Sequence, residues 1–188
     1  MSIKYSMSDR DRWDRALADV TADYSALSLK VRGQVDEAAK AIRGVKRELH
    51  RFAEDVDGAS ICASCGGECC LRGKYHVSVA DILVFLAEGE PLFTPRFDRD
   101  VCPYLDGHGC MMEPSLRPFP CITFNCERIE GFWEPQRIET FYRIERQLRT
   151  LYGELERLFA HRAGTARRIA LLGYDPDQER CTDGDNDQ

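Results

Sequence analysis

Eight of the nine cysteines fall within 65 residues, and this cluster constrains the chain more than any other feature. The first group has the spacing C-x2-C-x3-C-C, and the second has the spacing C-x7-C-x10-C-x4-C. The first group consists of Cys62, Cys65, Cys69 and Cys70. The second group consists of Cys102, Cys110, Cys121 and Cys126. So many thiols in so short a stretch predict disulfides, a metal site or redox chemistry.

The rest of the sequence favours metal over disulfides. Residues 1–10 lack the apolar core of a secretion signal, and the longest apolar run, Ile82 to Ala87, is too short to cross a bilayer. These features predict a soluble, cytoplasmic protein without membrane contact, in a compartment where thiols stay reduced. Dense cysteine spacing is then typical of metal binding. Thiolates are soft ligands, so Zn²⁺ and an iron–sulfur cluster are both candidates, and the spacing does not decide between them.

The cysteine groups are embedded in the motifs C-x2-C-x3-C-C, C-P-Y-L-D-x3-C and R-P-x2-C-x4-C. This pattern resembles the CxxCxxCC zinc- or iron-chelating domain family, the YkgJ-type cysteine-cluster proteins. The resemblance covers about a third of the chain, from Cys62 to Cys126, and implies metal binding by all eight cysteines. There are two departures: three residues rather than two precede the vicinal pair, and Ile122 stands where many relatives have arginine. One branch of the family, the flagellin lysine methylases, carries a similar cysteine domain within an enzyme.

Residues 8–56 carry an apolar pattern that predicts a long helix. Apolar or small residues recur in steps of three and four from Trp13 to Val56, and Ser8 followed by acidic residues is typical of a helix N-cap. We expect one mostly continuous helix. The alternative is two helices with a break near residues 21–28 or at Gly33.

A second helical stripe runs from Ile138 to Leu158, in a helix expected from about residue 134 to residues 161–164. Between the two stripes, Ser78 is expected to cap a short helix over residues 79–87. The stretch 91–121 contains six prolines and is expected to be irregular, so a metal would have to stabilise it. A last short helix is expected over residues 166–172.

These patterns predict a mainly α protein in which two long antiparallel helices flank a small, loop-rich, metal-stapled cysteine domain at one end. The expected units are an N-terminal helical arm (1–57), the cysteine-cluster domain (58–133), C-terminal helices that pack on the arm (134–175) and a disordered acidic tail (176–188). The first stripe is longer than the second, so Trp13 to Val31 needs another cover. That cover could be the final short helix, a fold-back or a second copy, and it motivates the prediction of a homodimer through the N-terminal helix.

Other charged and ligating residues are weaker candidates. The net charge of −6 gives no electrostatic basis for nucleic-acid binding. With eight thiols present, neither His76 nor His108 is needed as a ligand, and Cys181 in the tail is expected to be dispensable. Three basic residues could offset the charge of a thiolate-rich site: Arg72, Lys74 and Arg117. Arg117 is predicted either to support the site structurally or to be an ordinary exposed arginine.

The adjacent residues Cys69 and Cys70 predict that the sulfurs are divided between two centres. Neighbouring side chains diverge, so both sulfurs rarely reach one tetrahedral ion. In the split arrangement Cys62, Cys65 and one of the vicinal pair take a fourth ligand from the second group, and the other vicinal cysteine joins the remaining three. Three alternatives stay open: a vicinal cysteine that only supports a ligand, two separate sites with one per group, and a single four-cysteine cluster.

The sequence thus predicts a metal-binding protein whose thiolates hold zinc or an iron–sulfur cluster that supports the fold, while the helices contact a protein partner. The alternative is an iron–sulfur enzyme or redox module, similar to the flagellin methylases. A metal chaperone or sensor with an open site is a third hypothesis. No cofactor-binding glycine loop is visible, which argues against the enzyme, and no catalytic residue is predicted.

Overall fold

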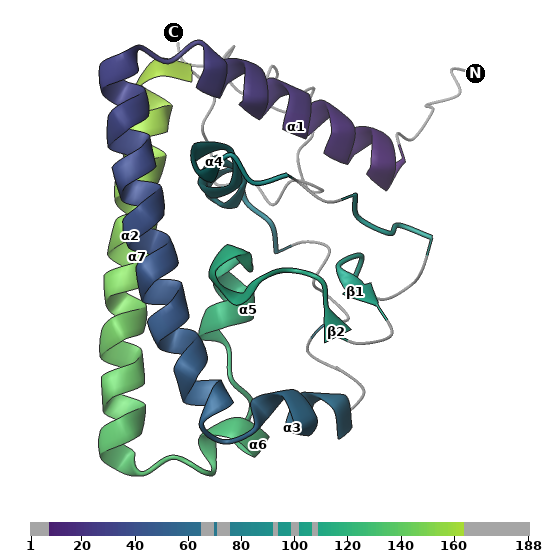
Figure 1. Cartoon of the computed structure of the whole chain (residues 1–188), viewed down its shortest axis with the longest axis vertical. Coiled ribbons are helices and arrows are strands. Elements are labelled where there is room, and N and C mark those ends of the chain that lie inside the picture. Colours follow the sequence, from purple (N-terminus) through teal and green to yellow (C-terminus); the bar gives the residue numbers. More distant parts are fainter. Residues whose placement is uncertain are drawn as a thin grey trace, which may run out of the picture.

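A computed structural model of the chain is mainly helical, as predicted (Figure 1). The structure describes residues 8–64, 70, 76–91, 94–98, 102–106 and 109–163. Its elements are α1 (Asp9–Ser25), α2 (Leu29–Glu54), α3 (Gly58–Ser64), α4 (Val79–Glu88), β1 (Leu105–Asp106), β2 (Gly109–Cys110), the 3-10 helix η2 (Pro114–Leu116), α5 (Phe119–Thr123), α6 (Glu127–Glu130) and α7 (Pro135–Ala163). The predicted helix over 166–172 and the acidic tail lie outside the described residues. No helix in the described part of the chain combines the length and the apolar character needed to cross a membrane.

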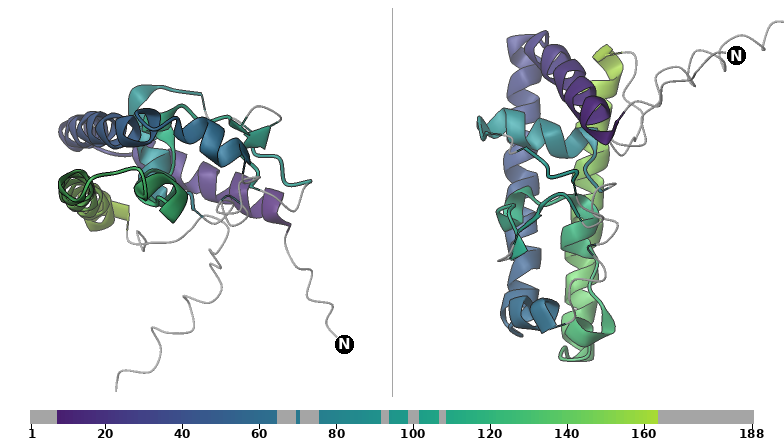
Figure 2. Two further views of the ribbon diagram at one scale, coloured as in Figure 1. Left: turned by 90° about the horizontal axis from the view of Figure 1, so that it is seen from below. Right: turned by 90° about the vertical axis from the view of Figure 1, so that its right-hand side faces the viewer.

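The two longest helices, α2 and α7, lie side by side along most of their length (Figures 1 and 2). Their facing sides are apolar at helical spacing, so each helix buries one stripe against the other. Fully buried members of this core are Val35, Ala39, Ile42, Leu148 and Leu155. At one end of the pair the rings of Phe52 and Phe141 meet edge to face, with centroids 5.4 Å apart. There Trp133 Nε1 also donates a hydrogen bond to the Phe52 carbonyl oxygen at 3.1 Å.

The prediction of one mostly continuous N-terminal helix is wrong, and the alternative of two helices is correct. α1 ends at Ser25, and α2 begins at Leu29 with Ser28 as its N-cap. Neither glycine nor proline marks this break. Instead the side chain of Arg32 donates to the Ser25 carbonyl oxygen at 2.7 Å, which satisfies a backbone acceptor left open at the end of α1. The predicted N-cap of the first helix, Ser8, is confirmed and forms a capping box with Asp11.

The break lets α1 fold across the molecule, where it packs against α4 (Figure 1). Trp13 is buried and packs against Phe97 and Tyr104, with ring centroids 6.3 and 6.0 Å apart. Arg10 donates to the Pro95 carbonyl oxygen at 2.9 Å. A fold-back within the chain therefore buries the apolar stripe of α1, and the homodimer prediction loses the observation that motivated it.

The short helix α4 follows its prediction closely. Ser78 and Asp81 form a capping box at its start, and Gly89 ends it with φ 64°, a conformation that glycine adopts without strain. Ile82 and Leu83 are fully buried. Asp81 is also buried, although it is a carboxylate.

The segments that carry the second cysteine group lie along the side of α2, between α1 and α3, and not at one end of the long helices (Figure 1). η2 and α5 both pack against α2. The stretch 91–121 was expected to be irregular. Within its described residues it holds only a hairpin of two two-residue strands, a 3-10 turn and the start of α5. Its position along α2 brings Cys121 near the polar side chains of Lys46, Asp81 and Tyr152.

Candidate metal centre

The structure places six of the eight predicted ligands, and two, Cys65 and Cys69, lie outside the described residues. Cys62 is in α3, Cys70 is a single described residue, Cys102 precedes β1, Cys110 ends β2, Cys121 is in α5 and Cys126 is the N-cap residue of α6. Of the second group, Cys102 is buried, Cys126 is half-buried, and Cys110 and Cys121 keep exposed surface. All four are free thiols.

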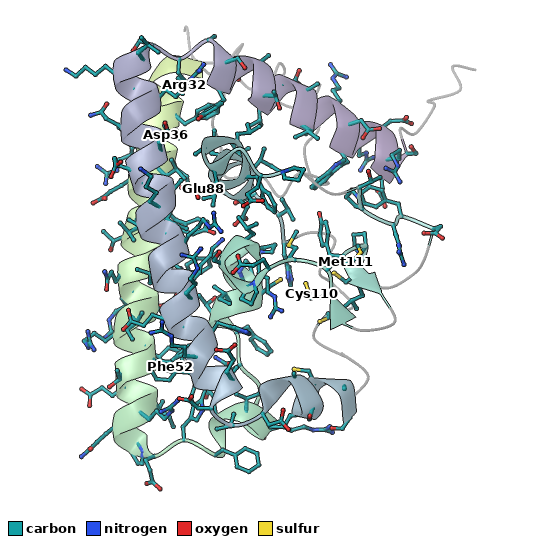
Figure 3. The ribbon with its side chains drawn as sticks, in the orientation of Figure 1. Arg32, Asp36, Phe52, Glu88, Cys110 and Met111 are labelled. Atoms are coloured by element: carbon teal, nitrogen blue, oxygen red, sulfur yellow. The ribbon has the colours of Figure 1, made fainter. Side chains whose placement is uncertain are left out.

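Local structure sets the position of each second-group thiol. In the hairpin, Leu105 pairs with Cys110, and the Leu105 N–H donates to the Cys102 carbonyl oxygen at 3.1 Å. These contacts keep Cys102 and Cys110 near the same end of the hairpin. Figure 3 shows Cys110 on the side of the molecule away from α2 and α7.

Cys121 lies in α5, which begins after Pro118 and spans only five residues. Its backbone N–H donates to the Pro118 carbonyl oxygen at 2.9 Å. A helix this short is unstable by itself, so tertiary contacts have to fix its position. Buried Ile122 provides one such contact, and the ring of Phe119 meets the ring of Tyr152 edge to face, with centroids 5.1 Å apart.

Four thiols from both cysteine groups share one electrostatic environment. Desolvation by the surrounding protein raises the pKa of the Cys121 thiol, and the charges of Cys110, Cys102, Asp81 and Cys70 raise it further. Burial likewise raises the pKa of Cys102, with a smaller contribution from Cys110, although a backbone hydrogen bond from Tyr104 opposes it. Thiolates held this close repel one another. A cation among them would remove that repulsion.

His76 lies beside this group of thiols, although the sequence indicated no need for it as a ligand. Its Nδ1 lies 3.2 Å from the Cys121 Sγ atom, within hydrogen-bonding distance. Burial lowers the pKa of His76, which favours the neutral imidazole. A neutral imidazole can donate to a thiolate or bind a metal. The sequence feature that could have pointed to His76 was its position between the two cysteine groups. His108 lies outside the described residues.

Cys62 and Cys126 belong to a different part of the structure, where α3 packs against α6. The helices approach closely at Gly58: a Cβ atom there would lie 2.8 Å from the Ala53 carbonyl oxygen and 3.1 Å from Ile129 Cδ1. Glycine is therefore required at the start of α3. The packing brings the helix that carries Cys62 to the helix that Cys126 precedes, again joining the first cysteine group to the second.

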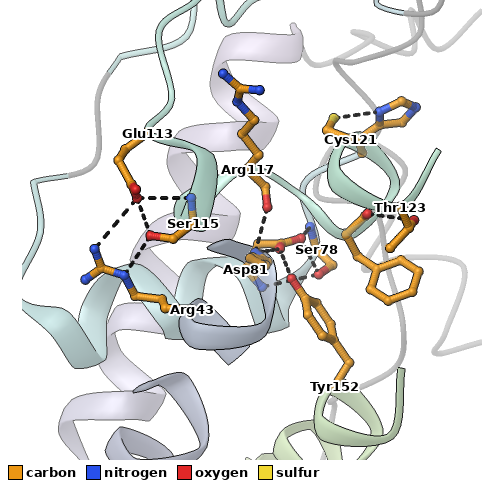
Figure 4. Close-up of polar contacts among 12 residues, drawn as sticks. Arg43, Ser78, Asp81, Glu113, Ser115, Arg117, Cys121, Thr123 and Tyr152 are labelled. Atoms are coloured by element: carbon orange, nitrogen blue, oxygen red, sulfur yellow. Dashed lines mark hydrogen bonds and ion pairs between the residues drawn. The ribbon is translucent and has the colours of Figure 1, made fainter. Parts of the chain in front are cut away.

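A buried polar network lies beside α5 (Figure 4). The Lys46 Nζ atom donates to Asp81 Oδ1 at 3.3 Å and to the Arg117 carbonyl oxygen at 2.6 Å. The Tyr152 hydroxyl donates to the same Asp81 oxygen at 2.6 Å, and Ser78 donates to the other carboxylate oxygen through its N–H and its hydroxyl. Burial lowers the pKa of Lys46, although Asp81 opposes this, and burial raises the pKa of Tyr152.

Lys46 was not among the residues predicted from the sequence, but the spacing of Lys46 within its helix was informative. Lys46 follows Ile42 by four residues and precedes Leu49 by three, which puts it on the buried face of α2. Of the basic residues considered for the site, Arg72 and Lys74 lie outside the described residues. Arg117 is half-buried, and its Nε donates to the Met112 carbonyl oxygen at 3.3 Å, which supports a structural role.

The donor types suit a thiophilic metal, because thiols and an imidazole from segments far apart in the sequence lie in one region of the structure. Among the described residues, however, no three Cys, His, Asp or Glu side chains converge closely enough to hold an ion. Comparison with known proteins adds no family name: no family model, curated protein or solved structure matches the chain. The case for metal binding therefore depends on the cysteine pattern and on the environment of the thiols.

Proposed function

We propose that the chain is a metal-binding cysteine-cluster protein in which thiolates hold Zn²⁺ or an iron–sulfur cluster that supports the fold. One observation supports this most: Cys70, Cys102 and Cys110, from both groups, lie near enough to Cys121 to add to the effect of burial in raising its pKa. Ionising thiols this near to one another is unfavourable unless a cation compensates the charge of the thiolates. Bound metal would supply that charge and tie the segments together.

The eight sulfurs are divided between two centres in this proposal. Cys70, Cys102, Cys110 and Cys121 would form one, and His76 would hydrogen bond to or replace one of its ligands. Cys62 and Cys126 would belong to the other, because α3 and α6 pack together. Its remaining ligands, Cys65 and Cys69, are proposed from the sequence pattern alone. This division corresponds to the split of the vicinal pair that the sequence predicts.

The wider proposal is a cytoplasmic protein in which two long antiparallel helices present a metal-stapled cysteine region to a protein partner. Side-chain pairs along α2 and α7 support the antiparallel arrangement: Asp55 pairs with Arg137, and Phe52 pairs with Phe141. No described feature adds support to an enzyme of the flagellin-methylase type, so the iron–sulfur enzyme stays an alternative that the metal content would test.

The experiment is elemental analysis and visible absorption of the full-length protein purified without oxygen. A brown protein with iron and sulfide would indicate an iron–sulfur cluster, and a colourless one with zinc would indicate a zinc site. Cys121→Ser should lose metal, whereas the matched substitution Cys181→Ser, at the cysteine outside the cluster, should keep all of it. A protein without bound metal, or equal metal content in the Cys121→Ser variant, would contradict the proposal.

A further inference from the structure

Lys46 is completely buried, which is unusual for a lysine. Moving an ammonium group out of water is costly unless charged and polar partners compensate it. Asp81 supplies the charge, and the face of the Tyr152 ring lies 5.3 Å from the Lys46 Nζ atom. A buried ion pair by itself contributes little to stability, because desolvation offsets the attraction. The position of Lys46 therefore calls for a reason beyond tying α2 to α4.

The shortest contact of Lys46 suggests that reason. Its Nζ atom is 2.6 Å from the Arg117 carbonyl oxygen but 3.3 Å from Asp81. Arg117 ends η2 and leads into Pro118, the N-cap residue of α5. Pro118 makes no side-chain capping hydrogen bond. The Lys46 ammonium group thus holds the chain immediately before the short helix that carries Cys121.

The same group is placed to affect the thiols electrostatically. The charge of Cys121 acts on Lys46, and Asp81 acts on Cys121 in turn. Lys46 is the one fully buried cation among the described residues. Its positive charge would offset part of the negative charge of thiolate ligands at Cys121.

We propose that Lys46 is a positioning residue for the metal centre at Cys121: by holding the Arg117 carbonyl oxygen, it fixes α5 and with it the position of the Cys121 sulfur. This inference rests on the proposed metal-binding function and assigns part of it to a side chain that touches no metal. A role limited to helix packing is the alternative. The two differ in whether loss of Lys46 changes the metal site of a folded protein.

The test compares Lys46→Met with Tyr152→Phe in the full-length, reduced protein. Tyr152→Phe removes a hydrogen bond from the same network but leaves the contact to Arg117 intact, so it is the matched control. Because Lys46→Met leaves the buried Asp81 carboxylate without its cation, the double variant Lys46→Met/Asp81→Asn is included as well. Each protein is titrated with Co²⁺ and then with competing Zn²⁺, and helix content is followed by circular dichroism.

Both Lys46 variants should keep their helix content, bind Co²⁺ about 10- to 100-fold more weakly and show shifted thiolate-to-cobalt absorption bands. Tyr152→Phe should bind within about twofold of the wild type, because it keeps the contact between Lys46 and Arg117. Three results would overturn the inference: wild-type binding and spectra in the double variant, equal losses in Tyr152→Phe and the Lys46 variants, or unfolding of both Lys46 variants. A wild-type protein that binds neither ion, and that as purified contains neither zinc nor iron, would instead refute the proposed function itself.

Discussion

The pair α2 and α7 and the thiol-bearing segment from Cys102 to Cys126 are held in place by different means. The long helices bury apolar stripes against each other, with Ile42, Leu148 and Leu155 fully inaccessible. The described part of the thiol-bearing segment has only short elements. It buries a few apolar side chains such as Leu116 and Ile122, and polar contacts such as that from Lys46 to Arg117 also anchor it to α2. The helical pair buries long continuous apolar stripes, whereas the thiol-bearing segment buries fewer apolar residues, and we propose that metal adds further ties to this segment.

The largest single-residue effect should come from the helical pair. Ile42→Ala removes a fully buried side chain between α2 and its neighbours and leaves a cavity. We expect a loss of about 2–5 kcal/mol in the free energy of unfolding, measured by urea denaturation. Leu29→Ala in the same helix is the control, because Leu29 is 86% exposed and should change stability by less than about 0.5 kcal/mol. Equal effects at the two positions would break the comparison.

A smaller effect is expected at the junction between the two regions. Ser78→Ala removes the N-cap of α4 and one donor to Asp81, and should cost about 1–2 kcal/mol in urea denaturation. Ser28→Ala, at the N-cap of α2, is the control and should cost less, because its hydroxyl accepts from the Val31 N–H at a longer distance, 3.5 Å. If Ser28→Ala cost more, capping of α2 would matter more than the shared network at Asp81.

The smallest effect concerns the joint between α1 and α2, where the Tyr24 hydroxyl donates to Asp36 at 2.8 Å. Tyr24→Phe should cost about 0.5 kcal/mol near neutral pH, because the site is partly exposed. Burial, together with the Asp36 carboxylate, raises the pKa of Tyr24 from 10.0 to about 12. A raised pKa favours the neutral phenol in the folded state, so this contribution is fully present below pH 10 and is lost as the pH rises through about 12.

The corresponding measurement is the unfolding midpoint of wild type and Tyr24→Phe in urea, near neutral pH and again near pH 12. The difference between the two proteins should disappear at the higher pH. A difference that stays constant, or that grows with pH, would show that the hydrogen bond to Asp36 does not depend on a protonated Tyr24.

Regular elements were predictable from sequence where spacing and caps agree. The stripe of α7, the Ser8 cap and the Ser78 cap of α4 are all confirmed. The break before Ser28 was only an alternative, because no glycine or proline marks it and the fold-back of α1 depends on tertiary contacts such as Trp13 with Tyr104. Local pattern cannot reveal such contacts.

At the candidate site, too, local sequence pattern predicted some features and missed those that depend on tertiary contacts. Cysteine spacing identified thiols of both groups that lie in one region of the structure, but it could not assign partners among them, because the positions of η2 and α5 depend on tertiary contacts with α2. His76 was set aside because eight thiols sufficed, yet its Nδ1 lies 3.2 Å from Cys121 Sγ. Lys46 was not predicted as a buried residue, because lysine side chains are usually exposed, although its helical spacing placed it on the buried face.

The central claim is that metal holds the thiol-bearing segment while packing holds the helical pair. Hydrogen exchange of the full-length protein, with and without a strong chelator under reducing conditions, tests this most directly. Chelation should remove protection from amides of residues 102–126 and leave amides in the middle of α2 and α7 protected, because the buried stripe does not involve metal. Unchanged protection at residues 102–126, or equal loss in both regions, would contradict the claim.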